Sequence, residues 1–62
     1  MMLKKLRQVR RLRGYTQEEL AIKIGLSQSV FSKKENGLVV FTVQEAFTLS
    51  KILECDIDVF YN

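Results

Sequence analysis

The sequence of 62 residues contains no proline, histidine or tryptophan and only one cysteine. Without a second cysteine no disulfide forms within the chain, which is typical of a reducing, intracellular compartment, so we expect a cytoplasmic location. The single thiol, Cys55, has apolar neighbours and no histidine to activate it, and we expect a core residue and not a nucleophile. The same shortage of ligand residues predicts no metal site and no cofactor, and it makes an enzyme the least expected class of protein.

Long apolar runs are also absent. No run approaches the 18 residues of a membrane helix, and the N-terminus lacks the apolar region of a signal peptide, so neither membrane insertion nor export is expected. A chain of this length is expected to form one small domain, residues 1–62, that buries only about 60% of its unfolded surface. Each helix cap therefore contributes a large share of the stability.

Charge is unevenly distributed along the chain. The net charge is +3, but residues 1–37 hold nine cations and three acids, a net charge of +6, whereas residues 38–62 hold one cation and four acids, a net charge of −3. The first half is therefore expected to bind a polyanion. A basic helix at 2–13 is also compatible with an anionic membrane surface, but its apolar face lacks aromatic residues and is needed to cover the following helices.

The strongest local signals lie in residues 16–37, with the sequence TQEELAIKIGLSQSVFSKKENG. Thr16 and Glu19 form a capping box, and Gly25 suits the left-handed conformation that ends a helix. Ser27 then provides a second N-cap. The pattern predicts two short helices joined by a tight turn.

Two further helices are predicted after this segment. Thr42 and Glu45 form a second capping box, which opens a helix at 43–53. Asp56 can cap a last short helix at 57–60. The apolar spacing of the longer helix predicts five core residues: Val43, Ala46, Phe47, Ser50 and Leu53.

The second helix of the 16–37 segment carries polar side chains over an arc of about 140°. This polar arc consists of Gln28, Ser29, Ser32, Lys33 and Asn36, whereas Val30, Phe31 and Lys34 are expected to point the other way. The arc has amides, hydroxyls and an ammonium group but no carboxylate. Such groups on a helix that fits the major groove can bind base edges, with Gln suited to adenine and Lys to guanine. An ordinary solvated helix face is the alternative interpretation.

Arg10 and Glu35 lie beside the apolar stripes of their helices. Arg10 falls next to Leu3 and Leu6, and Glu35 next to Phe31. A half-buried Arg needs a carboxylate partner, so we expect the two side chains to pair and to connect the first helix to the third. Two unconnected surface charges are the alternative.

The segment GYTQEELAxKxGLSQSxxSKxENG resembles the helix-turn-helix of the Cro and phage-repressor family, also called the XRE family. The most specific matches are Gln17, Ala21, Gly25, Ser27, Gln28 and the closing Glu35, Asn36 and Gly37. The resemblance covers nearly the whole chain. It implies an all-α fold, a compact bundle of five short helices in which the second and third helices form the helix-turn-helix.

The resemblance also implies roles for individual residues. Three match base-contacting positions: Gln28, Ser29 and Lys33. Two further candidates for contacts with bases or thymine methyls are Ser32 and Val30. Gln17 matches a DNA-backbone contact that also supports the recognition glutamine, although by itself it can equally be a solvated first-turn residue. Asn36 matches a second backbone contact, and Arg10 and Glu35 match a structural salt bridge.

Two positions depart from the family pattern. Lys34 replaces a residue that is usually apolar, and we expect its methylene stem to cover the core while its ammonium reaches water. After Gly37, where the family usually has a polar loop, this chain has four apolar residues: Leu38, Val39, Val40 and Phe41. Three interpretations stay open for them: burial in the monomer, a dimer contact, or a docking site for another protein.

Together these features predict a sequence-specific DNA-binding transcription regulator, most simply a repressor. The third helix would enter the major groove of double-stranded DNA, and a homodimer would bind a pseudo-palindromic site. An antitoxin or partner-binding protein that uses the patch from Leu38 to Phe41 is the alternative. A protein-interaction domain that has kept this fold without DNA binding is a third possibility.

Overall fold

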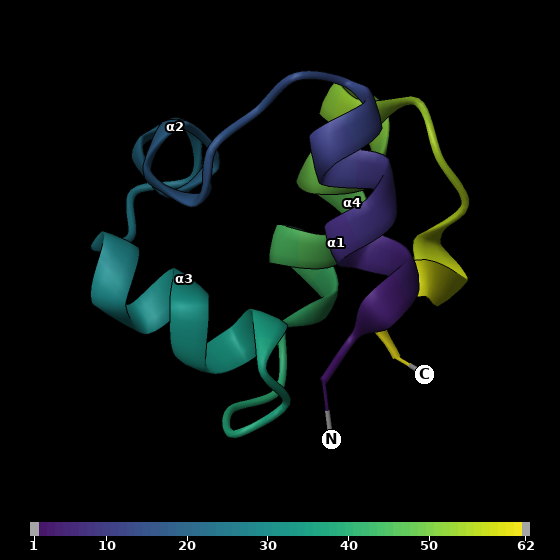
Figure 1. Cartoon of the computed structure of the whole chain (residues 1–62). Helices are drawn as coiled ribbons and strands as arrows, with labels where there is room; N and C mark the ends of the chain where they lie inside the picture. Colours follow the sequence, from purple (N-terminus) through teal and green to yellow (C-terminus); the bar gives the residue numbers. More distant parts are fainter. Residues whose placement is uncertain (1, 62) are drawn as a thin grey trace.

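The computed structural model describes residues 2–61, and within this range every regular element is helical (Figure 1). Four α-helices are followed by a 3-10 helix: α1 (Lys4–Leu12), α2 (Gln17–Lys23), α3 (Gln28–Glu35), α4 (Val43–Leu53) and η1 (Ile57–Phe60). No helix in the described part of the chain has the length and apolarity to span a bilayer.

The all-α prediction is confirmed, but the expected count of five α-helices is not met. The last element, η1, is a 3-10 helix of four residues. Its backbone bonds join residues three apart, Val59 N–H to Asp56 O at 3.3 Å and Tyr61 N–H to Asp58 O at 3.1 Å. Four residues are too few to build the i to i−4 bonds of a stable α-helix, so the tighter turn forms instead.

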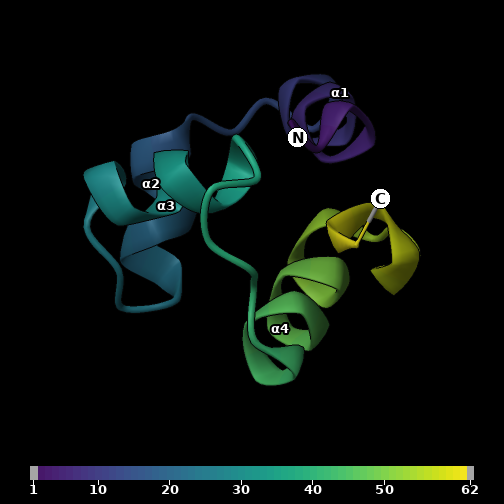
Figure 2. The same ribbon diagram turned by 90° about the horizontal axis from the view of Figure 1, so that it is seen from below.

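The helices lie in two groups around the core. Helices α2 and α3 form one side of the molecule, and α1, α4 and η1 form the other (Figure 1). Seen from below, an extended segment leads from the end of α3 to the start of α4 (Figure 2). The Leu3 N–H donates to Glu35 O at 2.9 Å, and this bond holds the start of α1 against the end of α3.

Capping side chains fix the helix starts as the sequence predicts. Thr16 Oγ1 accepts from the Glu19 N–H at 3.0 Å, and Glu19 Oε1 accepts from the Thr16 N–H at 2.8 Å. The same reciprocal pair joins Thr42 and Glu45 at 3.1 and 3.0 Å. A cap of this kind contributes about 1 kcal/mol, which is a substantial share of the stability of so small a domain.

The end of α4 is unusual because Glu54 adopts the left-handed conformation, with a φ of 54°. A glycine would take this conformation without steric cost. Arg13 compensates, since its Nε donates to Leu53 O at 2.9 Å and its Nη2 to Glu54 O at 3.3 Å. A side chain from the end of α1 therefore satisfies carbonyl groups that the helix terminus leaves without intrahelical partners.

The core is formed by aliphatic residues from α1, α2, α4 and η1 and by three aromatic rings, one of which, Phe31, belongs to α3. Phe41 lies between the other two rings, and its centroid is 5.7 Å from that of Phe31 and 5.2 Å from that of Phe60, both in edge-to-face geometry. These offset contacts are favourable beyond the area they bury. The fully buried leucines are Leu6, Leu20, Leu49 and Leu53.

The predicted core face of α4 is wrong at two positions. Ala46, Ser50 and Leu53 are buried as expected, but Val43 is 74% exposed and Phe47 is 54% exposed. The buried stripe is centred nearer to Leu49, so Val43 and Phe47 lie beside it on a strip of α4 that no element covers among the described residues.

Candidate nucleic-acid interface

Helices α2 and α3 are joined by a tight turn. Gly25 has a φ of 75°, and its N–H donates to Ile22 O at 3.2 Å, while the Leu26 N–H donates to Ala21 O at 2.9 Å. Ser27 Oγ then accepts from the Val30 N–H at 3.2 Å and starts α3. Buried residues of both helices enter the common core, so the orientation of α3 against α2 is fixed by packing.

The polar arc of α3 lies on the surface. Gln28, Ser29 and Lys33 are exposed, and Ser32 and Asn36 are half-buried. No carboxylate lies on the arc. The arc therefore presents hydrogen-bonding groups and one positive charge to the outside, as binding to the edges of bases requires.

On the opposite side of α3, the prediction holds for two residues of three. Phe31 and Lys34 are buried, at 0% and 7% exposure, but Val30 is 37% exposed. In the helical projection Val30 falls between Lys33 and Lys34, about 60° beyond the Lys33 edge of the polar arc, so it lies at the border between the arc and the buried side. Its contact with a thymine methyl stays a prediction.

Glu35 is the centre of a buried charged network. Its carboxylate is fully buried and accepts from Arg10 twice, from Nε at 2.9 Å and from Nη2 at 3.3 Å. Arg10 also donates from Nη1 to Tyr15 O at 2.9 Å. The ion pair expected from the sequence is therefore present, and it joins α1 to α3 and to the segment before α2.

Gln17 takes part in the same network. Its Nε2 donates to Glu35 Oε1 at 2.6 Å, and it makes no hydrogen bond to Gln28 in the described part of the chain. The expected support of Gln28 by Gln17 is thus wrong in this structure. A carboxylate is a stronger acceptor than an amide oxygen, which explains why the Gln17 amide is directed to Glu35. Its contact with a DNA phosphate stays a prediction.

A second chain of polar contacts connects α1 to the polar arc. Arg7 Nη2 donates to Asn36 Oδ1 at 3.2 Å, and Asn36 Nδ2 lies 3.4 Å from Ser32 Oγ. Arg7 Nε is 3.7 Å from Glu35 Oε1, which is an ion pair without a hydrogen bond. Asn36 is therefore held from two sides at the end of α3.

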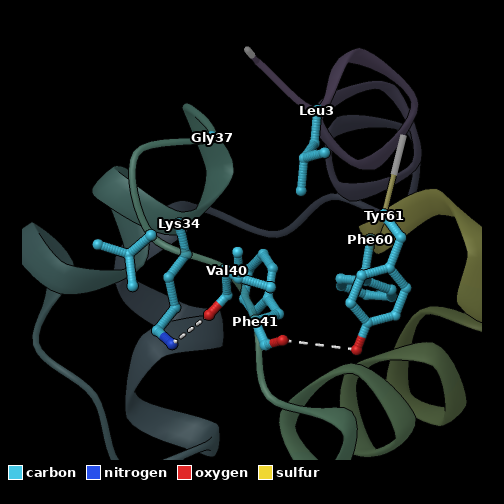
Figure 3. A pocket seen from close by; sticks show the side chains of 8 residues that line it. Leu3, Lys34, Gly37, Val40, Phe41, Phe60 and Tyr61 are labelled. Carbon is cyan, nitrogen blue, oxygen red and sulfur yellow. Dashed lines mark hydrogen bonds between the residues drawn. The ribbon is translucent and has the colours of Figure 1, made fainter.

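Lys34 does not extend its ammonium into water as expected. Its Nζ donates to Glu45 Oε1 at 2.9 Å and to Val40 O at 3.1 Å, the latter drawn in Figure 3. Burial acts to raise the pKa of Glu45, but the bonds from Lys34 and Thr42 outweigh it and hold that pKa below its ordinary value of 4.5. Lys34 thus fastens the loop after α3 to the first turn of α4.

The four apolar residues after Gly37 divide into two kinds. Leu38, Val39 and Val40 are exposed, at 74%, 44% and 73%, whereas Phe41 is 2% exposed in the core. Of the three interpretations left open by the sequence, burial in the monomer is the one that holds for Phe41. On α4, Val43 and Phe47 are one helical turn apart and are also exposed, at 74% and 54%. We call Leu38, Val39, Val40, Val43 and Phe47 the apolar patch.

A cavity of about 290 Å³ adjoins the apolar patch. Figure 3 shows Phe41 and Phe60 at its base, Leu3 pointing into it from the start of α1, and the Tyr61 hydroxyl directed to Phe41 O, at 3.5 Å. Its remaining walls include Val39 and Val40. The exposed loop thus lies beside a hollow of mostly apolar character.

Sequence reasoning missed three contributors to this region: Arg7, Glu45 and Tyr61. Arg7 falls next to Arg10 in the helical projection of α1, and this proximity was an available signal.

The only cysteine, Cys55, lies away from this region. Burial raises the pKa of its thiol, which makes it a weak nucleophile. Within residues 2–61 no group of three acidic or Cys side chains is placed to hold a metal ion.

The fold and the exposed arc define a helix-turn-helix domain. A family model described as helix-turn-helix matches residues 6–60, which is most of the chain. The chain therefore belongs to the Cro and phage-repressor, or XRE, family of helix-turn-helix proteins, and the predicted resemblance is confirmed. The match places it among DNA-binding transcription regulators of this type. No curated protein and no solved structure showed significant similarity to the chain.

Proposed function

We propose that this protein is a sequence-specific repressor that inserts α3 into the major groove of double-stranded DNA. The observation that carries the proposal is the exposed polar arc, which bears amide, hydroxyl and ammonium groups and no carboxylate. The arc belongs to the half of the chain with a net charge of +6. Positive charge attracts the phosphate backbone, and the arc supplies the donors and acceptors that distinguish bases.

Each group of the arc has a specific task in this proposal. Gln28, at the start of α3, reads adenine, and Lys33, one and a half turns later, reads guanine through O6 and N7. Ser29 contributes a hydroxyl between them. Gln17 and Asn36 bind phosphates on either side of the groove and set the depth and angle of α3.

A homodimer completes the proposed function. One module of this size buries too little surface for high affinity, so two copies bind half-sites about one helical turn, or roughly 34 Å, apart. The Cα extents of the domain are 22 × 22 × 20 Å, and side chains widen it to about 28 Å. Two domains in side-by-side contact therefore have a separation of the same order as that of the half-sites.

The apolar patch is the surface we assign to this dimer contact. Its exposed residues carry no charge, so they cannot bind phosphate through their side chains. The loop from Leu38 to Val40 follows directly after α3, so in this proposal the dimer contact lies beside the reading helix of each copy. In a two-fold dimer the apolar patch of one copy contacts the apolar patch of the other, and uncharged apolar side chains are compatible with that symmetry.

A second candidate function uses the same patch for a different protein, as an antitoxin does. The observation that favours it is the amount of apolar surface left exposed on the isolated domain, with Leu38 and Val40 each more than 70% exposed. Co-purification of a partner encoded in the same operon, together with a monomeric state of the isolated chain, supports this second function over the homodimer.

Replacement of Lys33 by Ala tests base reading. We expect Lys33→Ala to weaken binding to the preferred duplex by about 1–3 kcal/mol and to relax the preference at one base position. Lys23→Ala, a change of an exposed lysine on α2 outside the arc, is the matched control. Equal losses on all sequences contradict base reading by Lys33, because a phosphate ligand weakens binding uniformly.

A further inference from the structure

The buried network around Glu35 contains one positive charge too many. Two guanidinium groups, those of Arg7 and Arg10, face a single carboxylate. Arg10 donates two hydrogen bonds to the Glu35 carboxylate, and Gln17 Nε2 donates a third at 2.6 Å. Arg7 Nε stays at 3.7 Å from Glu35 Oε1, and this buried nitrogen has no hydrogen-bond partner within residues 2–61.

An excess cation of this kind is costly in a mostly buried position. The side chain of Arg7 is only 26% exposed, so water compensates for little of the lost solvation. In the structure its neighbours are Asn36, which offers a neutral amide oxygen, and a carboxylate already occupied by other donors. The network of Arg7, Arg10 and Glu35 therefore has a net charge of +1, which one additional anion would neutralise.

The position of Arg7 identifies the anion. In the helical projection Asn36 falls near the centre of the polar arc, and the Arg7 guanidinium is bonded to it at 3.2 Å. The bond from the Leu3 N–H to Glu35 O keeps this part of α1 against α3. Arg7 thus reaches the margin of the surface that faces the double helix, although it belongs to a different helix from the arc.

We infer that Arg7 and Asn36 together bind one phosphate of the DNA backbone. The inference rests on the proposed DNA-binding function and adds a ligand from α1 to it. The planar guanidinium donates to the phosphate oxygens and neutralises their charge. The Asn36 amide nitrogen has two hydrogens, of which Ser32 Oγ accepts one, and the other donates to the same phosphate. The bound phosphate supplies the negative charge that the network lacks.

The test compares the salt dependence of duplex binding by Arg7→Gln, Lys5→Gln and the unaltered protein. Lys5 is an exposed cation on the side of α1 opposite to Arg7, so the control removes the same charge at a different place. We expect Arg7→Gln to lower the slope of log K against log salt by about 0.9 and to weaken binding equally on preferred and random duplexes. Lys5→Gln keeps the slope.

A slope for Arg7→Gln equal to that of the unaltered protein overturns the inference. If Arg7→Gln does not fold, Arg7→Lys replaces it in the test, because this variant keeps the positive charge. A salt slope equal to that of the unaltered protein, together with weaker binding, supports the phosphate contact. A slope lowered by about 0.9 contradicts the phosphate contact. Failure of the unaltered protein to bind any duplex is a different result, since it removes the proposed function itself and not only the role of Arg7.

Discussion

Loss of the Glu35 charge is expected to destabilise the domain more than any other single change in a polar residue. In Glu35→Gln the buried Arg10, at 7% exposure, loses its carboxylate, and Arg7 loses the one carboxylate that it pairs with among residues 2–61. Removal of one partner from a buried ion pair costs about 3–5 kcal/mol. Domains of this length have a total free energy of unfolding of about 3–9 kcal/mol. The variant therefore retains little stability.

The structure also predicts an asymmetry between the two partners. In Arg10→Met the Glu35 carboxylate keeps its bond from Gln17, and the Arg7 guanidinium can close the 3.7 Å gap to pair with it. Arg10→Met should therefore cost less than Glu35→Gln. The double variant should cost less than the sum of the two single changes, because it also removes the Arg10 guanidinium that Glu35→Gln alone leaves buried without its carboxylate.

Urea unfolding followed by circular dichroism measures these effects at one fixed protein concentration, since a dimer makes stability depend on concentration. Arg11→Gln is the control, as Arg11 is an exposed cation on α1. A change of less than about 1 kcal/mol for Glu35→Gln, or strict additivity in the double variant, refutes the central place of Glu35 in the fold.

Two more predictions concern the loop after α3. The double variant Leu38→Ser, Val40→Ser should shift the chain from dimer to monomer in sedimentation. Ile22→Ser, at an equally exposed site on α2, is the control and should leave the dimer intact. A double variant that stays dimeric shows that the apolar patch is not the dimer interface. The lowered pKa of Glu45 means that its bond to Lys34 stabilises the fold above pH 4.5 and that this contribution is lost as the pH falls through the lowered pKa. Lys34→Met should therefore lose less free energy of unfolding than the control Lys33→Met as the pH falls below about 4.5. Identical acid profiles for the two variants contradict this prediction.

The parts of the fold that the sequence predicts correctly depend on residues close together in the chain. The capping boxes of Thr16 with Glu19 and Thr42 with Glu45 are local, so their spacing was enough to find them. The pairing of Arg10 with Glu35 is not local, but each residue lies at the edge of an apolar stripe, and a buried charge needs a partner.

The wrong predictions concern residues whose burial or hydrogen-bond partner depends on how one helix packs against another. A helical projection groups Val43 with Ala46 on one side of α4, but it does not give the width of the strip that neighbouring helices cover. The partner of Lys34 depends on how the first turn of α4 lies against α3, which no local pattern specifies. The contact from Gln17 to Glu35, in place of Gln28, likewise results from the position of α2 against the end of α3.

Selection of binding sites from a pool of random duplexes, followed by a salt titration on the recovered sites, tests the central claim most directly. The proposal predicts enrichment of two-fold symmetric sequences with half-sites about one helical turn apart, and affinity that falls steeply as salt is raised. A pool that stays random, with no salt-dependent binding to any duplex, contradicts the claim that the polar arc of α3 reads DNA.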